Sequence, residues 1–122
     1  MPESEYIDMF NRKLCEFIDD LTCSFPELND FKLFKNMLEL AIYIDKKSPH
    51  KMFDNTVAKL YRDKIISKNE DFFLDEQYNT AYHDINLINK LKTVWKTIDN
   101  SNKEIIWQYM NVLLILNDRC HR

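Results

Sequence analysis

One stretch near the end of the chain is apolar on almost every side: Glu104-Ile105-Ile106-Trp107-Gln108-Tyr109-Met110-Asn111-Val112-Leu113-Leu114-Ile115-Leu116. Only Glu104, Gln108 and Asn111 in it are clearly polar. A helix that is apolar around nearly its whole circumference belongs inside a hydrophobic core. The stretch is shorter than the roughly 20 residues needed to span a bilayer. We therefore predict that it forms the central helix of the fold, against which the other helices pack.

The composition narrows the fold class further. The chain has 122 residues, the usual size of one domain. Its 45% hydrophobic and 30% charged residues argue against disorder. Glycine is absent, and glycine is the usual residue in tight hairpin turns and in loops that let the backbone approach a phosphate. A hairpin-rich sheet and a nucleotide-binding enzyme of the P-loop or dinucleotide type are both disfavoured.

Apolar residues recur at every third or fourth position along most of the chain, which is the pattern of amphipathic helices. Proline divides this pattern, because Phe25-Pro26 should end the first helix and Ser48-Pro49 should start the third. The sequence predicts an all-α, single-domain bundle of about five helices over residues 1–122. The expected helices span 4–22, 30–45, 49–66, 84–98 and 102–117, with an irregular segment at 67–83.

Two of these helices carry more detailed expectations. In the second helix the expected core positions are Phe31, Phe34, Met37, Leu38, Ala41 and Ile42, in a stripe widened by Leu33, Leu40 and Ile44. In front of the last helix, Ser101 and Glu104 match a capping box. The short loop before it should make the last two helices an antiparallel pair, with Trp95 and Trp107 in or near their shared seam.

Positive charge is concentrated in residues 31–68, which carry nine basic and four acidic side chains, net +5. The candidate nucleic-acid-binding residues there are Lys46, Lys47, Lys51, Lys59 and Arg62. They would form a phosphate-contacting patch if they shared one exposed face. The alternative is an ordinary solvated helix face, which the net charge of −3 for the whole chain favours.

A second candidate lies in the irregular segment. Phe72, Phe73 and Leu74 stand between the acidic pairs Glu70-Asp71 and Asp75-Glu76. An apolar tip framed by acids is one form of docking point for a partner protein. It is equally a plug that folds back and closes one end of the bundle.

Candidates for catalysis and metal binding are weak. The three histidines and the cysteines Cys15, Cys23 and Cys120 show no spacing that selects a metal site or a nucleophile–base pair. We expect no enzyme activity, cofactor, metal or small-molecule substrate. The odd number of cysteines and the absence of a basic start followed by an apolar run predict an intracellular protein without disulfides or a signal peptide.

The order of several helix residues resembles a family of small uncharacterised proteins of nucleocytoplasmic large DNA viruses that infect algae and protists. The residues that carry the likeness are Phe17-Ile18-Asp19-Asp20-Leu21, Phe25-Pro26-Glu27, Lys51-Met52-Phe53, Tyr61-Arg62-Asp63-Lys64-Ile65, Glu70-Asp71-Phe72-Phe73-Leu74 and Asn102-Lys103-Glu104-Ile105-Ile106-Trp107-Gln108-Tyr109. They form a pattern of helix residues without a diagnostic motif. The resemblance implies a viral protein in the host cytoplasm or nucleus, or in the virion, and carries no activity with it.

The expected function is accordingly non-catalytic. We expect a viral protein that acts by protein–protein interaction, as an adaptor or a virion-associated structural component, through a protein partner or through self-association. Nucleic-acid binding through residues 46–68 is the alternative. No membrane association is expected.

Overall fold

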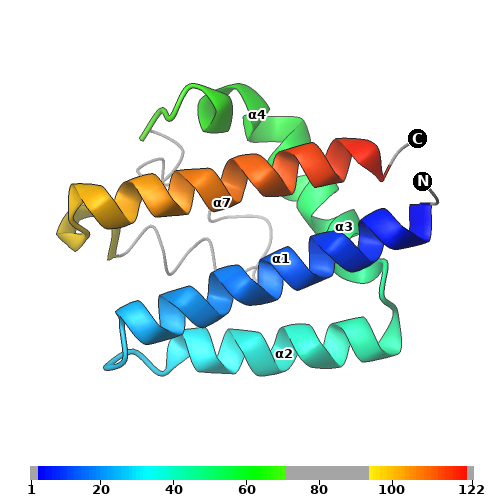
Figure 1. Ribbon diagram of the computed structural model, residues 1–122, viewed down its shortest axis with the longest axis horizontal. Helices are drawn as coiled ribbons and strands as arrows, with labels where there is room; N and C mark the ends of the chain where they lie inside the picture. The colour runs from blue at the N-terminus through cyan, green and yellow to red at the C-terminus, as the bar shows by residue number, and fades with distance from the viewer. Residues whose placement is uncertain (1–2, 71–93, 121–122) are drawn as a thin grey trace.

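The computed structural model of the protein describes residues 3–70 and 94–120 (Figure 1). Every regular element in these residues is helical, so the predicted all-α class is confirmed. The long helices are α1 (Glu3–Ser24), α2 (Asp30–Ile44) and α7 (Asn100–Arg119). A helical run over residues 48–66 comprises α3 (Ser48–Phe53), the π-helical turn η1 (Asp54–Ala58) and α4 (Lys59–Ile66).

Helix α7 is central, as its sequence predicts. It packs lengthwise against α1 and, at its other side, against η1 and α4, while α2 lies beyond α1 at the edge of the molecule (Figure 1). The side chains that α7 buries include Trp107, Met110, Leu113 and Leu114. Its burial is not complete, because Ile105, Val112 and Ile115 form an exposed strip along one face.

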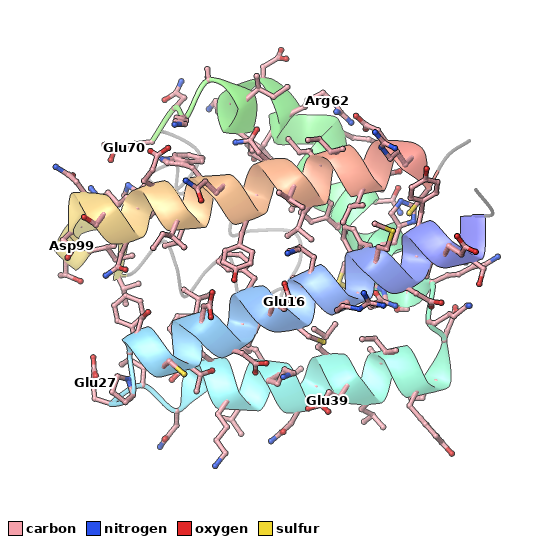
Figure 2. The ribbon with its side chains drawn as sticks, in the orientation of Figure 1. Glu16, Glu27, Glu39, Arg62, Glu70 and Asp99 are labelled. Atoms are coloured by element: carbon pink, nitrogen blue, oxygen red, sulfur yellow. The ribbon has the colours of Figure 1, made fainter. Side chains whose placement is uncertain are left out.

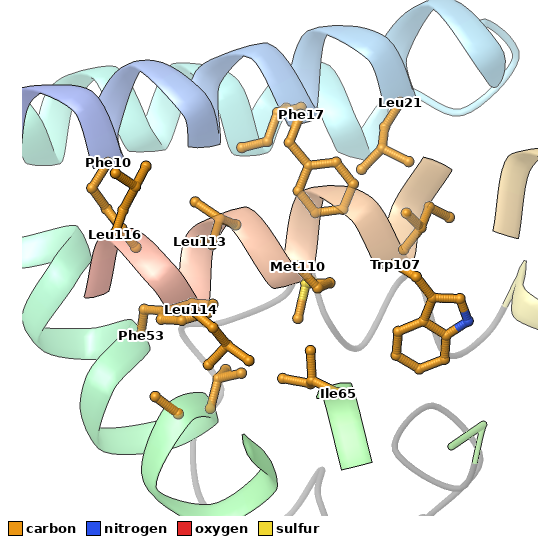
Figure 3. Packing of buried hydrophobic residues seen from close by; sticks show 14 of the residues in the cluster. Phe10, Phe17, Leu21, Phe53, Ile65, Trp107, Met110, Leu113, Leu114 and Leu116 are labelled. Carbon is orange, nitrogen blue, oxygen red and sulfur yellow. The ribbon is translucent and has the colours of Figure 1, made fainter. Parts of the chain in front are cut away.

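The hydrophobic core lies where α1, α7 and the helical run over 48–66 converge (Figure 3). Phe10 of α1 meets Phe53 of α3 edge-on, with ring centroids 5.3 Å apart. Farther along, Phe17 of α1 stacks on Tyr109 of α7 at 4.8 Å. Because aromatic rings fill this space from three elements, each helix depends on the others for its burial.

Only the end of the predicted helix 84–98 lies within the described residues. There, Trp95–Thr97 form a 3-10 turn, η3, which stops at the extended residue Ile98. The rings of Trp95 and Trp107 are in contact, as predicted, with centroids 5.5 Å apart. The rest of that predicted helix falls outside the described residues.

Two helix ends are built without glycine. At the start of α7 the Asp99 carboxylate accepts a hydrogen bond from the Asn102 backbone N–H at 2.9 Å, so Asp99 is the N-cap and the predicted capping box at Ser101 is wrong. Aspartate caps a helix as well as serine does, and it stands two residues earlier.

After α4, Lys68 takes a left-handed backbone with φ of 55°. This backbone turn allows the Asn69 N–H to donate a hydrogen bond to the Lys64 carbonyl at 2.8 Å.

Candidate functional site

The outer face of α2 carries the largest group of exposed apolar side chains in the described part of the chain. Leu33, Met37, Leu40 and Ile44 follow one another at intervals of four, three and four residues, which places them on one side of the helix. Their exposed fractions are 58%, 53%, 60% and 74%, and the adjacent Tyr43 is 89% exposed. We call these five residues the α2 outer face.

The opposite side of α2 explains why this face is uncovered. Phe31 is fully buried, and Phe34 and Leu38 pack against the same core. These residues face α1, which is the main neighbour of α2. Figure 2 shows the side chains on the far side of α2 projecting away from the rest of the molecule. The helix is therefore apolar over two faces, of which the fold covers one.

The sequence-based prediction treated these two faces as one wide core stripe. Met37, expected in the core, lies on the exposed side together with Leu33, Leu40 and Ile44, the residues expected to widen the stripe. A helix at the surface of a domain buries a stripe little more than 100° wide. The apolar positions of α2 extend over a wider arc than this, which indicates in the sequence that α1 alone could not cover them all.

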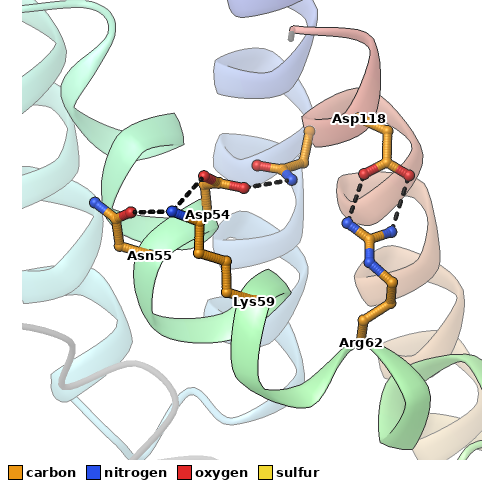
Figure 4. Close-up of polar contacts among 6 residues, drawn as sticks. Asp54, Asn55, Lys59, Arg62 and Asp118 are labelled. Atoms are coloured by element: carbon orange, nitrogen blue, oxygen red, sulfur yellow. Dashed lines mark hydrogen bonds and ion pairs between the residues drawn. The ribbon is translucent and has the colours of Figure 1, made fainter.

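Of the predicted basic patch, three side chains have acidic neighbours. Arg62 donates two hydrogen bonds to the Asp118 carboxylate, at 2.9 and 2.6 Å (Figure 4). These bonds raise the pKa of Arg62 above its usual value. Lys59 lies 3.8 Å from a carboxylate oxygen of Asp54.

Lys46 is held in the same way at the other end of the basic segment. Its ammonium group lies 3.6 Å from the Asp8 carboxylate and donates a hydrogen bond to the Ser4 hydroxyl at 2.6 Å. Lys47 and Lys51 are exposed. The neighbouring carboxylates reduce the positive potential that the predicted patch could present to a phosphate backbone.

The π-helical turn η1 is tied to α7 by a polar contact. Asn117, which is fully buried, donates from Nδ2 to the Asp54 carboxylate at 3.1 Å. Asp54 thus links Asn117 on one side with Lys59 on the other. π-Helical turns recur at functional sites. Here the surrounding groups bond to one another, and we assign the cluster a role in joining helices.

A shallow pocket lies between the C-terminal half of α1 and the start of α7. It spans about 260 Å³, partly open to solvent, and Tyr109, Ile105 and Phe25 are among its lining residues. Tyr109 donates a short hydrogen bond to Asp20. Partial burial, together with this bond, raises the pKa of Tyr109 to about 12. Most of this space is open solvent, and only about 20 Å³ of it is enclosed, room for about one water molecule, so we assign no substrate to this pocket.

The other predictions concern the Phe72–Leu74 segment, the cysteines, metal binding and membrane spans. Phe72, Phe73 and Leu74 lie outside the described residues. Cys15, Cys23 and Cys120 all lie in the described part and form no disulfide with one another. Across residues 3–70 and 94–120, no three metal-ligating side chains come together. No helix in those same ranges is long and apolar enough to cross a bilayer.

Comparison of the chain with protein-family models, with curated proteins and with solved structures gives no match. The fold is an all-α bundle. The feature that bears on function is the α2 outer face.

Proposed function

We propose that this protein is non-catalytic and acts by binding another protein surface through the α2 outer face, as an adaptor or a structural component. The observation that supports the proposal is the apolar side chains of that face, which follow a helical seam and remain 53–89% exposed. Contiguous exposed apolar surface of this kind is typical of interaction sites.

The energetic reason is the hydrophobic effect. Full burial of a large apolar side chain contributes about 1.5–3 kcal/mol, and each of these residues keeps more than half of its surface in water. A helix that packs in a groove or against another helix uses anchors at the same spacing of three and four residues. The α2 outer face therefore suits a partner that presents an apolar helical or grooved surface. The resemblance to proteins of large DNA viruses would place that partner in an infected cell or in the virion.

The proposal can be tested by site-specific photo-crosslinking in cells that express the protein. A photoreactive phenylalanine analogue replaces Leu40 in one version and Ile115 in the other. Ile115, on α7, is a matched control because it is also apolar and is 53% exposed. We expect crosslinked adducts of defined mass from position 40 and none of the same mass from position 115. Absence of any adduct specific to position 40 would refute the proposal.

A further inference from the structure

We infer that the partner of the α2 outer face is a second copy of this chain, and that the two α2 helices pack antiparallel about a two-fold axis. This inference rests on the proposed function and specifies it.

The spacing of the exposed residues supports the pairing. Intervals of four, three and four residues are those of the apolar seam in a two-helix coiled coil. With the axis midway between Met37 and Leu40, Met37 of each copy lies level with Leu40 of the other. In the same register, Leu33 lies level with Ile44 of the other copy. Every layer of the seam is then apolar on both sides, as a self-complementary two-fold interface requires.

The charges near the ends of α2 select the antiparallel direction. Antiparallel packing brings Asp30, at the start of one α2, to the same end of the interface as Lys47 of the other copy, which lies just beyond Ile44, the last residue of α2. A parallel pair would instead set each of these charges level with its own like charge. Opposite charges across an interface favour association and like charges disfavour it. The two helix dipoles also attract each other in the antiparallel direction.

The available area reaches the range of specific interfaces. At ordinary side-chain sizes, the five residues leave on the order of 600 Å² exposed on each copy. Face-to-face packing of two copies would then remove at most about 1,200 Å² from water, which is the lower limit for a specific protein–protein interface. We therefore expect a dimer with a dissociation constant in the micromolar range.

The exposed strip of α7 is the competing surface in the described part of the chain. Ile105, Val112 and Ile115 are exposed by 44%, 37% and 53%, less than most of the α2 outer face. The polar residue Gln108 interrupts the strip. The strip on α7 therefore offers less apolar area than the α2 outer face, and Ile115 in it is the site of the control substitution.

The first experiment is light scattering on the purified protein alone, over a range of concentrations. We expect the mass to rise from 14.8 kDa towards twice that value. Leu40→Glu should raise the dissociation constant at least about 100-fold, because it places a carboxylate in the apolar seam of each copy. Ile115→Glu should leave it unchanged. Circular dichroism of both variants checks that they fold, as expected for substitutions at exposed positions.

The second experiment tests the direction of pairing by spin-label distances. Labels are placed at Lys32→Cys or at Glu39→Cys, in a background where Cys15 and Cys23 are serine and Cys120 is alanine. In the antiparallel register, two labels at position 32 are separated by about 20 Å along the helix axis and two at position 39 by about 2 Å. The label pair at 39 should therefore be clearly closer. A parallel pair would give no such difference.

Three results would overturn the inference: a wild-type protein that stays monomeric, a dimer that Leu40→Glu leaves intact, or equal distances for the two label pairs. Failure of the inference can be told apart from failure of the proposed function. Crosslinks from position 40 to a different protein, together with a monomeric purified chain, would leave the function standing and remove only the dimer.

Discussion

The indole rings of Trp95 and Trp107 meet nearly at right angles, with an interplanar angle of 75°. Trp95 also donates from its indole nitrogen to the Glu70 carboxylate at 3.2 Å, and Glu70 pairs with Lys103 at 3.1 Å. The hydrogen bond from Lys103 lowers the pKa of Glu70. The residues that flank positions 71–93 on both sides are thus joined to the first turns of α7.

Trp107→Ala and Leu113→Ala should each lower the free energy of unfolding by about 2–5 kcal/mol, because both side chains are buried and their removal leaves a cavity. The measurement is urea denaturation followed by circular dichroism. Ile115→Ala, on the exposed side of the same helix, is the control and should cost below about 1 kcal/mol. A loss below about 1 kcal/mol at both buried sites would contradict the central position of α7.

Ionisation of Tyr109 should lower the free energy of unfolding at alkaline pH. Its pKa is raised to about 12 in the folded state, whereas an unfolded tyrosine ionises near its ordinary value of 10. Between these values the unfolded chain holds fewer protons at this residue than the folded chain. Raising the pH from 10 towards 12 therefore favours unfolding.

The test compares the pH dependence of unfolding in the wild type and in Tyr109→Phe, with the phenolate absorbance followed in the same samples. The variant should lose less stability above pH 10, since it lacks the ionising group. Identical slopes for the two proteins would show that burial and the Asp20 contact do not raise the pKa of Tyr109 in solution.

Lys68→Gly should stabilise the protein by about 0.5–1 kcal/mol, because a side chain is unfavourable at a left-handed backbone position and glycine is not. The loss of the exposed ion pair between Lys68 and Glu104 offsets little of this gain. Thermal unfolding at matched protein concentration measures the change. Ser67→Gly, where φ is −85°, is the control and should not stabilise. A lower melting temperature for Lys68→Gly would contradict the argument.

Nucleic acid should bind weakly or not at all. Arg62, Lys59 and Lys46 each have a carboxylate neighbour, and phosphate contacts would have to compete with it. We expect no shift of labelled DNA or RNA at about 50 mM salt, where electrostatic binding is strong. A shift that weakens steeply with added salt and with Lys51→Glu would restore the nucleic-acid alternative.

The helical class was predictable because local signals in this chain agree with one another. The apolar periodicity located α1, α2 and the run over 48–66 to within about two residues, the usual uncertainty of helix ends. Pro26 and Pro49 fixed two of the boundaries through their effect on backbone dihedrals. The contact between Trp95 and Trp107 followed from the shortness of the loop that joins their segments.

The remaining features depend on tertiary structure. Periodicity shows which side of α2 is apolar, but it does not show how much of that side α1 can cover, so the exposure of Met37 was missed. The sequence pointed to Ser101 as the cap of α7, whereas the extended backbone at Asp99 makes Asp99 the residue that accepts from the Asn102 N–H. The carboxylate neighbours of Arg62 and Lys46 are remote in sequence, and no spacing rule could have paired them.

The π-helical turn η1 bears on how this helix could have evolved. A π turn holds one more residue than an α-helical turn, so removal of one residue from it would leave an ordinary α-helix. Deletion of one residue within 54–58 would turn α4 by roughly 100° relative to α3. Phe53 would keep its contact with Phe10, whereas Arg62 would turn away from Asp118. An inserted residue at this point would thus have given the second half of the helix a different neighbour while leaving the first half in place.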